Sequence, residues 1–490
     1  MSATLAPDPD TDVATTPDRP RRSVVPVLTR SVLPFLLLLG CLLAAVRLAA
    51  IPLTNFDTYF HLRFGHEFLT DWSLRHPGSV TTYATADWVP TQWLPEVVMA
   101  RAEDWFGLAG VAWLSGLQLC TLVIVFYLVA RRQASAIIAA TVTVFALIAS
   151  LPGLTMRPQV ISYILIAVTM ALWLRARRDG TAPWLMVPMT WVWAMSHGMW
   201  PVGIVIGAVA AVGLLLDHDR AAWRQRLLVP LLSLVAAGLT PVGPALYSAV
   251  LLVSSRAQYF SEWDPPRFTT PSCLALLVLL ALTVTVLLRR DRTPWFDVLM
   301  LLLAAGFAVY SNRTVPVSAA MMVPLAALAL QVPSGPRTAP GRVERTAVAL
   351  AYALALVVLA IAVPRTSDAP PVQPAWMDQT LSALPAGTPV LDEWVWGGYL
   401  MWRYPNLDLT SHGYGDTFTT AELDRNTDVP RLEKGWIPAV SKMGVDYALL
   451  RTDSPLAYAL RTTQGWTVLH RSKALVLLHR PTDAADAPVG

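Results

Sequence analysis

Asp57 and His61 stand four residues apart, directly after an apolar segment at 31–53 that is long enough to cross a membrane. In a helix this spacing presents both side chains on one face. An acid where a membrane helix emerges is costly unless it is solvated or paired, which makes Asp57 a candidate functional residue. A carboxylate there can take a proton from a hydroxyl group or hold a divalent cation. We therefore expect chemistry in the loop 54–106, which also carries the candidate binding residues Arg63 and Glu96.

Other polar residues recur at the ends of apolar segments on the same predicted side. They are Arg157, His197, Glu262 and Arg313. Each has a simpler explanation, because an arginine at a helix end often reaches toward lipid phosphates, a histidine near tryptophans often lies at the interface, and a glutamate is often solvated. Their convergence on one membrane face instead favours a shared, water-facing cavity.

Acids, histidines and arginines together suit transfer of a group away from a phosphate. A sugar carried on a lipid phosphate has an anionic leaving group, and the arginine fork can bind that phosphate and neutralise its growing charge. Asp57 then fits the base that deprotonates an acceptor hydroxyl, with Arg157 or Arg313 on the phosphate. His61 and His197 would orient donor or acceptor.

The composition is that of a polytopic membrane protein. Hydrophobic residues make up 54% of the 490 residues, charged residues only 14%, and the mean hydropathy is +0.48; soluble domains carry about 25% charged residues. Apolar runs predict about eleven transmembrane helices, near 31–53, 107–130, 134–151, 158–174, 183–199, 200–216, 227–250, 271–288, 294–311, 314–332 and 346–364. Pro241 and Pro244 could break the seventh of these.

Arginine distribution predicts the orientation, because short cytoplasmic loops collect basic residues. With a cytoplasmic N-terminus, every inner segment is basic: Arg19, Arg21, Arg22 and Arg30; Arg131 and Arg132; Arg175, Arg177 and Arg178; Arg220, Arg224 and Arg226; Arg289, Arg290 and Arg292; Arg337, Arg342 and Arg345. The chain is then a multi-pass plasma-membrane protein. Its net charge of +4 suits the anionic inner leaflet of the bilayer and gives no reason to expect a nucleic-acid partner.

Three parts are expected along the chain: a disordered cytoplasmic tail at 1–30, a transmembrane domain at 31–364, and a small extracytoplasmic α/β domain at 365–490. Strands are predicted at 389–391 and 446–450, and a hairpin at 467–479. Helices are predicted at 375–384, 396–404, 436–443 and 455–462. The three cysteines all fall in apolar spans, so none is available for a disulfide in the outer domain.

The start of the loop 54–106 resembles the acidic first-loop motif of C-type (GT-C) glycosyltransferases. The resemblance lies in the stretch Asn55-Phe-Asp57-Thr-Tyr-Phe-His61-Leu-Arg63-Phe-Gly65. These glycosyltransferases are polytopic enzymes that include oligosaccharyltransferase catalytic subunits and protein O-mannosyltransferases. Further matches to a bacterial membrane family of this superfamily are Thr91-Gln-Trp-Leu-Pro-Glu96, Arg157-Pro-Gln159, Trp193-Ala-Met-Ser-His-Gly198, Glu262-Trp263 and Trp396-Gly-Gly-Tyr-Leu400. The resemblance covers about 30 to 480. It implies a GT-C-like fold, a polyprenyl-phosphate sugar donor and an extracytoplasmic acceptor, with Asp57 as base or metal ligand.

The departures from that family limit what carries over. No Trp-Trp-Asp-Tyr-Gly motif is present, so a peptide acceptor does not follow, and a cell-wall glycan, lipid or protein acceptor all stay open. The first motif has one acid where several relatives have two, which leaves open whether Mg²⁺ or Mn²⁺ is a cofactor. We expect an inverting glycosyltransferase; the alternatives are a non-catalytic scaffold and a transporter of lipid-linked glycan.

Overall fold

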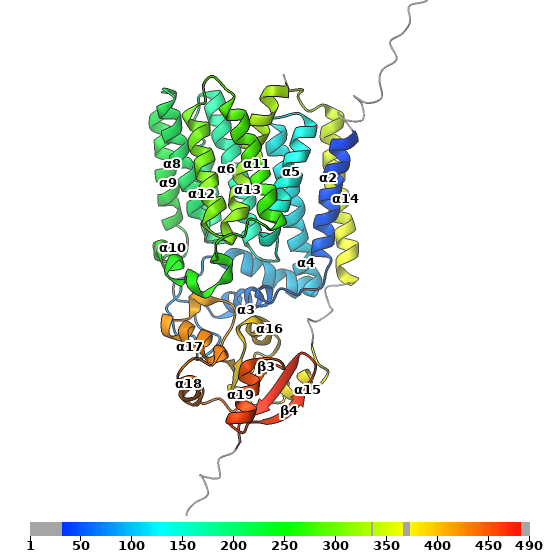
Figure 1. Cartoon of the computed structure of the whole chain (residues 1–490), viewed down its shortest axis with the longest axis vertical. Coiled ribbons are helices and arrows are strands. Elements are labelled where there is room, and N and C mark those ends of the chain that lie inside the picture. Colours follow the sequence, from blue (N-terminus) through cyan, green and yellow to red (C-terminus); the bar gives the residue numbers. More distant parts are fainter. Residues whose placement is uncertain (1–31, 335–336, 366–372, 482–490) are drawn as a thin grey trace, which may run out of the picture.

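The computed structural model describes residues 32–334, 337–365 and 373–481. The tail predicted at 1–30 and residues 366–372 of the predicted linker lie outside the described residues. The described chain forms a bundle of helices with a smaller unit, the C-terminal unit, stacked on one end (Figure 1). We call that end of the bundle the unit end and the opposite end the far end.

The bundle is built from helices that run mostly along one direction. Their bounds are α2 Leu33–Ala49, α3 Asp57–Thr70, α4 Trp93–Arg131, α5 Ala136–Ser150, α6 Gln159–Asp179, α7 Met186–Ser196, α8 Trp200–Leu216, α9 Trp223–Gly238, α10 Ala245–Arg256, α11 Pro271–Leu288, α12 Trp295–Tyr310, α13 Val315–Gln331 and α14 Arg342–Ala362. Short 3₁₀ turns include Leu151–Gly153, Ser261–Trp263 and Asn312–Thr314.

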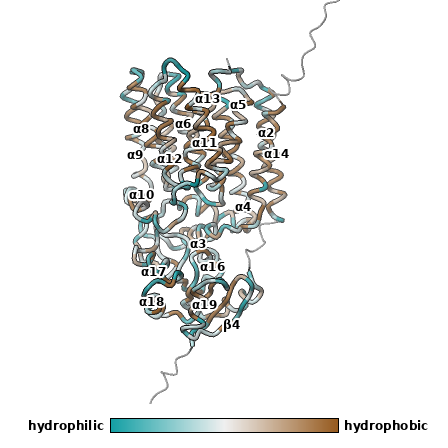
Figure 2. Tube along the Cα trace, viewed as in Figure 1, coloured by the Kyte–Doolittle hydropathy of each residue, from teal (hydrophilic) through white to brown (hydrophobic). Residues whose placement is uncertain are grey.

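Apolar residues dominate the bundle, whereas polar residues gather at its two ends and over the C-terminal unit (Figure 2). Among the described residues, six helices are long and apolar enough to cross a membrane, and α2, α8 and α12 are shorter apolar helices. Helix α13 lies at the centre, packed against α5, α6, α11 and α12, and it is the most buried of the six.

Two helix boundaries were not apparent from hydropathy. The single span predicted at 227–250 is wrong: α9 ends at Gly238, and α10 begins at Ala245. Pro241 and Pro244 lie between them, and proline cannot donate the backbone hydrogen bond that a continuous helix needs. Helix α4 begins well before the span predicted at 107–130, and Gly107 kinks it with φ 62°. The stretch before this kink, which carries Glu96, packs beside α3.

The C-terminal unit contains a mixed five-stranded sheet of order β2-β1-β3-β5-β4. Its strands are β1 Thr388–Asp392, β2 Leu407–Leu409, β3 Tyr447–Arg451, β4 Thr467–Arg471 and β5 Leu475–His479; its helices are α15 Trp376–Ser382, α16 Trp394–Arg403, α17 Thr420–Arg431, α18 Trp436–Met443 and α19 Pro455–Thr463. The predicted hairpin is confirmed as β4 and β5, which pair antiparallel. Helix α17 was not predicted, although its Thr419 and Glu422 form a capping box that is visible in the sequence.

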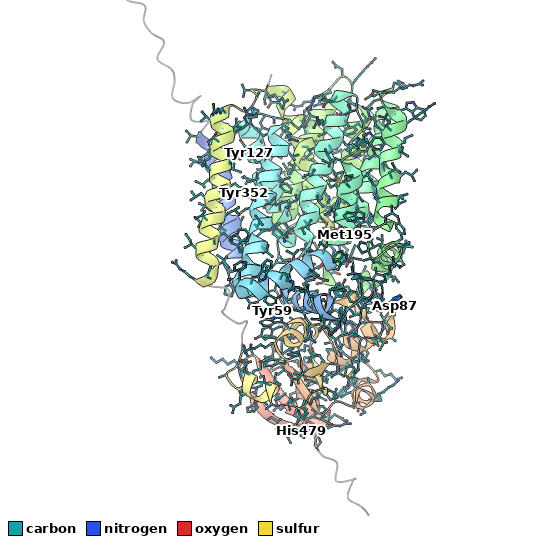
Figure 3. All side chains as sticks on the ribbon, turned by 180° about the vertical axis from the view of Figure 1, so that it is seen from behind. Tyr59, Asp87, Tyr127, Met195, Tyr352 and His479 are labelled. Carbon is teal, nitrogen blue, oxygen red and sulfur yellow. The ribbon has the colours of Figure 1, made fainter. Side chains whose placement is uncertain are left out.

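The two parts meet where α16 packs on α3. A Cβ atom on Gly398 would stand 2.5 Å from the carbonyl oxygen of Phe56, so only glycine permits this approach. The ring centroid of Tyr59 lies 5.0 Å from those of both Tyr399 and Trp402, and Figure 3 shows Tyr59 at this junction. The Trp396-Gly-Gly-Tyr399 stretch therefore holds the C-terminal unit against the helix that begins with Asp57.

Candidate functional site

A cavity of about 340 Å³ opens at the unit end of the bundle, between the helices and the C-terminal unit. It combines residues from segments that are far apart in sequence. They are Asp57, Phe60, His61, Gln92, Arg157, His197, Arg256, Tyr259, Phe260, Ser261, Glu262, Trp263, Arg313, Trp394, Gly413, Tyr414, Gly415 and Asp416. The structure thus brings together six of the eight predicted site residues.

An ionic network crosses the cavity. The Arg157 guanidinium donates from Nη1 to Asp57 Oδ2 at 2.8 Å and from Nη2 to Glu262 Oε2 at 3.0 Å; Nη1 also donates to Glu262 Oε1. Arg313 Nη1 donates to Glu262 Oε2 at 2.5 Å. Two guanidinium groups and two carboxylates from four segments of the chain therefore form one cluster.

Local structure holds Asp57 at the start of α3. The side-chain oxygen of Asn55 accepts the Asp57 backbone N–H at 3.1 Å, and an acid in the first turn is favoured by the helix dipole. Thr58 donates its hydroxyl to the carbonyl of Met156 at 2.9 Å, which ties α3 to the loop carrying Arg157. The helix spacing predicted for Asp57 and His61 is confirmed, because both belong to α3 and both line the cavity.

Gln159 fixes the position of the Arg157 guanidinium within the Arg157-Pro158-Gln159 motif. Its side-chain oxygen accepts from Arg157 Nη2 at 2.9 Å, while its Nε2 donates to the carbonyl of Gly153 at 2.9 Å. Because Gln159 is also the first residue of α6, the guanidinium is positioned by a rigid helix end.

Two buried histidines line the cavity, each held by a hydrogen bond. His61 Nδ1 lies 2.8 Å from Glu96 Oε1. His197 Nδ1 accepts from the Met199 backbone N–H at 3.3 Å and lies 2.9 Å from the hydroxyl of Ser162, which in turn accepts the Trp193 indole N–H. With Nδ1 of His197 occupied as an acceptor, its ring proton resides on Nε2, the nitrogen that is left to donate to a ligand.

The surroundings shift the pKa values of these groups. Burial raises the pKa of the half-buried Asp57 carboxyl above its ordinary value, although Arg157 opposes the shift. Burial also acts to raise the pKa of Glu262, but hydrogen bonds and charge from Arg157 and Arg313 outweigh it and leave that pKa lowered. Burial, followed by the charge of Arg157, lowers the pKa of His61 well below its usual range. The cavity thus holds a neutral His61 imidazole, an ionised Glu262 and an Asp57 carboxyl with raised proton affinity.

The C-terminal unit completes the cavity with the segment 413–416. A Cβ atom on Gly413 would stand 2.9 Å from Asp57 Oδ1, so this backbone closes directly over the carboxylate. Arg256, the last residue of α10, donates to the carbonyl of Asp416 at 2.9 Å and lies 3.6 Å from its carboxylate. Sequence reasoning missed Arg256 and the cavity role of Asp416, because they meet only through the tertiary fold.

Two predicted binding residues do not reach the cavity. Arg63 projects toward α16, where it donates to Glu67 Oε1 at 2.7 Å and to the Met401 carbonyl at 3.3 Å. Arg63 stands two residues after His61, about 200° further round the helix, so it faces away from the cavity and contributes to docking of the C-terminal unit. Glu96 does not line the cavity; it lies behind His61 and contacts that imidazole.

No group of three or more histidine, cysteine, aspartate or glutamate side chains suited to a metal gathers among the described residues. Two carboxylates, of Asp57 and Glu262, meet at a single guanidinium nitrogen of Arg157.

Comparison with known proteins found relatives by structure. No family model and no curated sequence matches the chain. The oligosaccharyltransferase AglB from Archaeoglobus fulgidus, in complex with an inhibitory peptide and a dolichol-phosphate, is similar with a TM-score of 0.55 at 12% identity, over 92% of this chain and 75% of that one. An apo structure of the A. fulgidus oligosaccharyltransferase gives 0.52 at 12% identity, over 86% and 70%. ArnT from Cupriavidus metallidurans in the apo state gives 0.50 at 17% identity, over 91% and 98%.

The fold is that of the GT-C glycosyltransferases. With its several apolar helices, the chain is a multi-pass membrane protein. At these identities the likeness establishes the fold, and the roles of individual residues rest on the geometry of the cavity.

Proposed function

We propose that this protein is a membrane glycosyltransferase that moves a sugar from a polyprenyl-phosphate-linked donor to an extracytoplasmic acceptor. The observation that carries this proposal is the ionic cluster of Asp57, Arg157, Glu262 and Arg313 inside one cavity at the end of a membrane bundle. Such a cluster supplies a base and a phosphate-binding pair within a few ångströms of each other.

Arg157 and Arg313 are the proposed phosphate ligands. Glu262 bridges both guanidinium groups, so an incoming phosphate would take over some of the contacts that this carboxylate makes. Bidentate arginine–phosphate pairs are among the stronger charge-assisted contacts in proteins. The similar archaeal oligosaccharyltransferase was solved with a dolichol-phosphate, which supports a lipid phosphate as the ligand in a fold of this kind.

Asp57 is the proposed catalytic base. Its carboxylate takes the proton of the acceptor hydroxyl as that oxygen bonds to the anomeric carbon from the face opposite the phosphate. The bond between the anomeric carbon and the phosphate oxygen breaks, and its electron pair stays on the phosphate, where Arg157 and Arg313 stabilise the charge. One displacement of this kind inverts the anomeric centre. A raised pKa suits Asp57 to this role, because a base acts best when its pKa lies closer to the working pH.

Asp57 and Glu262 are the residues that would hold a divalent cation. Mg²⁺ in proteins usually takes one or two carboxylates together with substrate phosphates and water; these two carboxylates now share Arg157 Nη1, which would have to move aside for the cation. When bound there, Mg²⁺ or Mn²⁺ would act as a Lewis acid on the phosphate. Asp57 as base and Asp57 as metal ligand are the two forms of the proposal, and sensitivity to a chelator separates them.

A second hollow of about 310 Å³ on the C-terminal unit marks the proposed acceptor path. It shares Tyr259, Phe260 and Trp394 with the first cavity and continues over Asn426 and Arg431. The Nδ2 group of Asn426 is buried, and no partner for it is found within the described part of the chain. Buried polar groups are normally hydrogen-bonded, so this amide is a ready donor for an acceptor group.

The orientation follows from the same proposal. With the N-terminus in the cytoplasm, the basic loops at the far end lie in the cytoplasm, and the cavity and C-terminal unit lie outside. Transfer would then take place at the extracytoplasmic surface of the plasma membrane.

Radiolabelled sugar transfer from polyprenyl-phosphate donors in membranes tests the proposal. Asp57→Asn should lower the rate by roughly 10²–10⁴, because it removes the basicity and keeps the size. The matched control is Asp87→Asn, which changes an exposed acid in the same loop that does not line the cavity. Near-normal transfer by Asp57→Asn would remove Asp57 from the mechanism. Substrate uptake into vesicles without any transfer would favour the transporter instead.

A further inference from the structure

Another charged cavity lies at the far end of the bundle, well away from the candidate site. It measures about 790 Å³ and is formed where the end of α4, the end of α6 and the start of α14 meet. Figure 3 labels two of its lining residues, Tyr127 of α4 toward this end of the bundle and Tyr352 about midway along α14. We call it the basic cavity.

Its rim is rich in arginine. Six guanidinium groups and two carboxylates line it, which leaves an excess of four positive charges: Arg131, Arg132, Arg175, Arg178, Arg337 and Arg345 against Asp179 and Glu344. The acids are already engaged. Glu344 accepts from Arg131 at 2.6 and 2.9 Å, and Asp179 accepts from Arg175 at 3.2 Å and from Arg178 at 2.9 Å.

Arg132 and Arg345 are the two most available charges. Both are exposed, and neither forms an ion pair with an acid in the part of the chain that the structure describes. Glu344 is not free to form an ion pair with either arginine, because both of its carboxylate oxygens accept hydrogen bonds from Arg131 and one of them also accepts from the Tyr127 hydroxyl at 3.0 Å. Within the described part of the chain this positive charge has no acidic partner, which suits the binding of an anion.

Much of the remaining wall of the basic cavity is apolar. Ile124 and Leu128 from α4, Ala171 from α6, and Val348 and Ala349 from α14 line it. Leu128 is 44% exposed, so this wall opens at the surface of a membrane helix. A guanidinium rim above an apolar wall matches a molecule with a phosphate at one end and hydrocarbon at the other.

We propose that the basic cavity binds an anionic phospholipid from the leaflet at the far end, with its phosphate between Arg132 and Arg345 and its acyl chains along Ile124, Leu128 and Val348. Basic pockets between transmembrane helices are known to bind anionic headgroups. In the orientation proposed above this leaflet is the cytoplasmic one, but the site does not depend on any catalytic role of the opposite cavity. It would tie α4, α6 and α14 together at one end of the bundle.

Native mass spectrometry of the delipidated full-length chain in detergent tests this inference. We expect phosphatidylglycerol to bind and phosphatidylcholine to bind at least tenfold more weakly. The double variant Arg132→Gln/Arg345→Gln should lose about 30-fold in phosphatidylglycerol affinity. Arg132→Lys/Arg345→Lys should retain most of it, because the charge is kept.

The matched control is Arg220→Gln/Arg292→Gln, which removes two exposed arginines from other basic loops at the same end of the bundle. It should change affinity less than twofold. An equal loss in the control would mean a diffuse surface attraction and would overturn the inference, as would equal binding of phosphatidylcholine. Displacement of the lipid by millimolar inorganic phosphate would show a free-anion site and would also overturn it.

Discussion

At the scale of single residues, Arg157 and Arg313 are not equivalent. Arg157 binds Asp57, Glu262 and Gln159, so its removal leaves two carboxylates without their main partner. Arg313 binds Glu262 and lies over the Trp263 ring at 5.5 Å, and Glu262 keeps Arg157 when Arg313 is lost. Arg313 is therefore the cleaner probe of phosphate binding.

Arg313→Ala should weaken binding of the lipid-phosphate donor by tenfold or more without unfolding the chain, and Arg313→Lys should recover only part of it, because lysine lacks the planar fork. Titration with donor, together with the thermal midpoint, checks this. Arg267→Ala is the control, since Arg267 is exposed and lies outside the cavity. Unchanged donor affinity in Arg313→Ala would assign Arg313 to the interface with lipid headgroups.

The pH dependence of transfer should report Asp57. A base must be deprotonated, so kcat/KM should fall as pH drops through the raised pKa of Asp57 and should begin to fall at a higher pH than for an ordinary aspartate. Asp57→Asn should abolish this acid limb in its residual activity. Persistence of the same limb in the variant would assign it to another group.

At the scale of elements, the packing of α16 on α3 positions the start of α3. Gly398→Ala places a methyl group against the backbone carbonyl of Phe56. Because a backbone carbonyl cannot rotate away as a side chain can, α16 and α3 would have to move apart to make room. A shift of about 1 Å at a positioned group can cost roughly 10² in rate. We expect kcat to fall with little change in donor affinity. Gly306→Ala, where no atom lies within 4 Å of the added Cβ, is the control and should be neutral; a normal kcat in Gly398→Ala would show that this contact does not matter.

The end of β1 carries a buried acid that makes the C-terminal unit sensitive to pH. Burial raises the pKa of Asp392 from 3.8 to about 8, against hydrogen bonds from Ser411 and Thr410. The unfolded chain releases this proton near pH 4, whereas the folded chain keeps it up to about pH 8, so stability should fall as pH rises through this window. Asp392→Asn resembles the neutral acid and should flatten this decline. Melting temperatures between pH 5 and 8 check it; an equally steep decline in the variant would exclude Asp392 as its source.

At the scale of the whole molecule, the bundle places its polar chemistry at opposite ends. The chain enters α2 at the far end, since α2 leads directly to α3 at the junction with the C-terminal unit. Tags at the two termini should therefore report opposite sides of the membrane in a protease-protection assay. A tag in the loop at 220, beside the far end, should report the same side as the N-terminus. Both termini on one side would contradict the predicted odd number of crossings.

The sequence by itself determined which segments are apolar helices, which loops are basic, and which residues carry chemistry. These properties are local: hydropathy runs over about twenty residues, and the pairing of Asp57 with His61 follows from helix spacing. The break between α9 and α10 belongs to the same class, because Pro241 and Pro244 are visible in the chain.

Only the tertiary structure decided which of these residues meet. Arg157 reaches Asp57 across 100 positions and Glu262 across 105, and Arg256 meets Asp416 across 160. No local pattern encodes such contacts, because they depend on how helices and the C-terminal unit dock. The same docking turns Arg63 toward α16 and away from the cavity, although it lies only two residues from His61 in a motif that sequence reasoning treated as one unit. A helix presents successive residues in different directions, so the packing partner of each face decides its role.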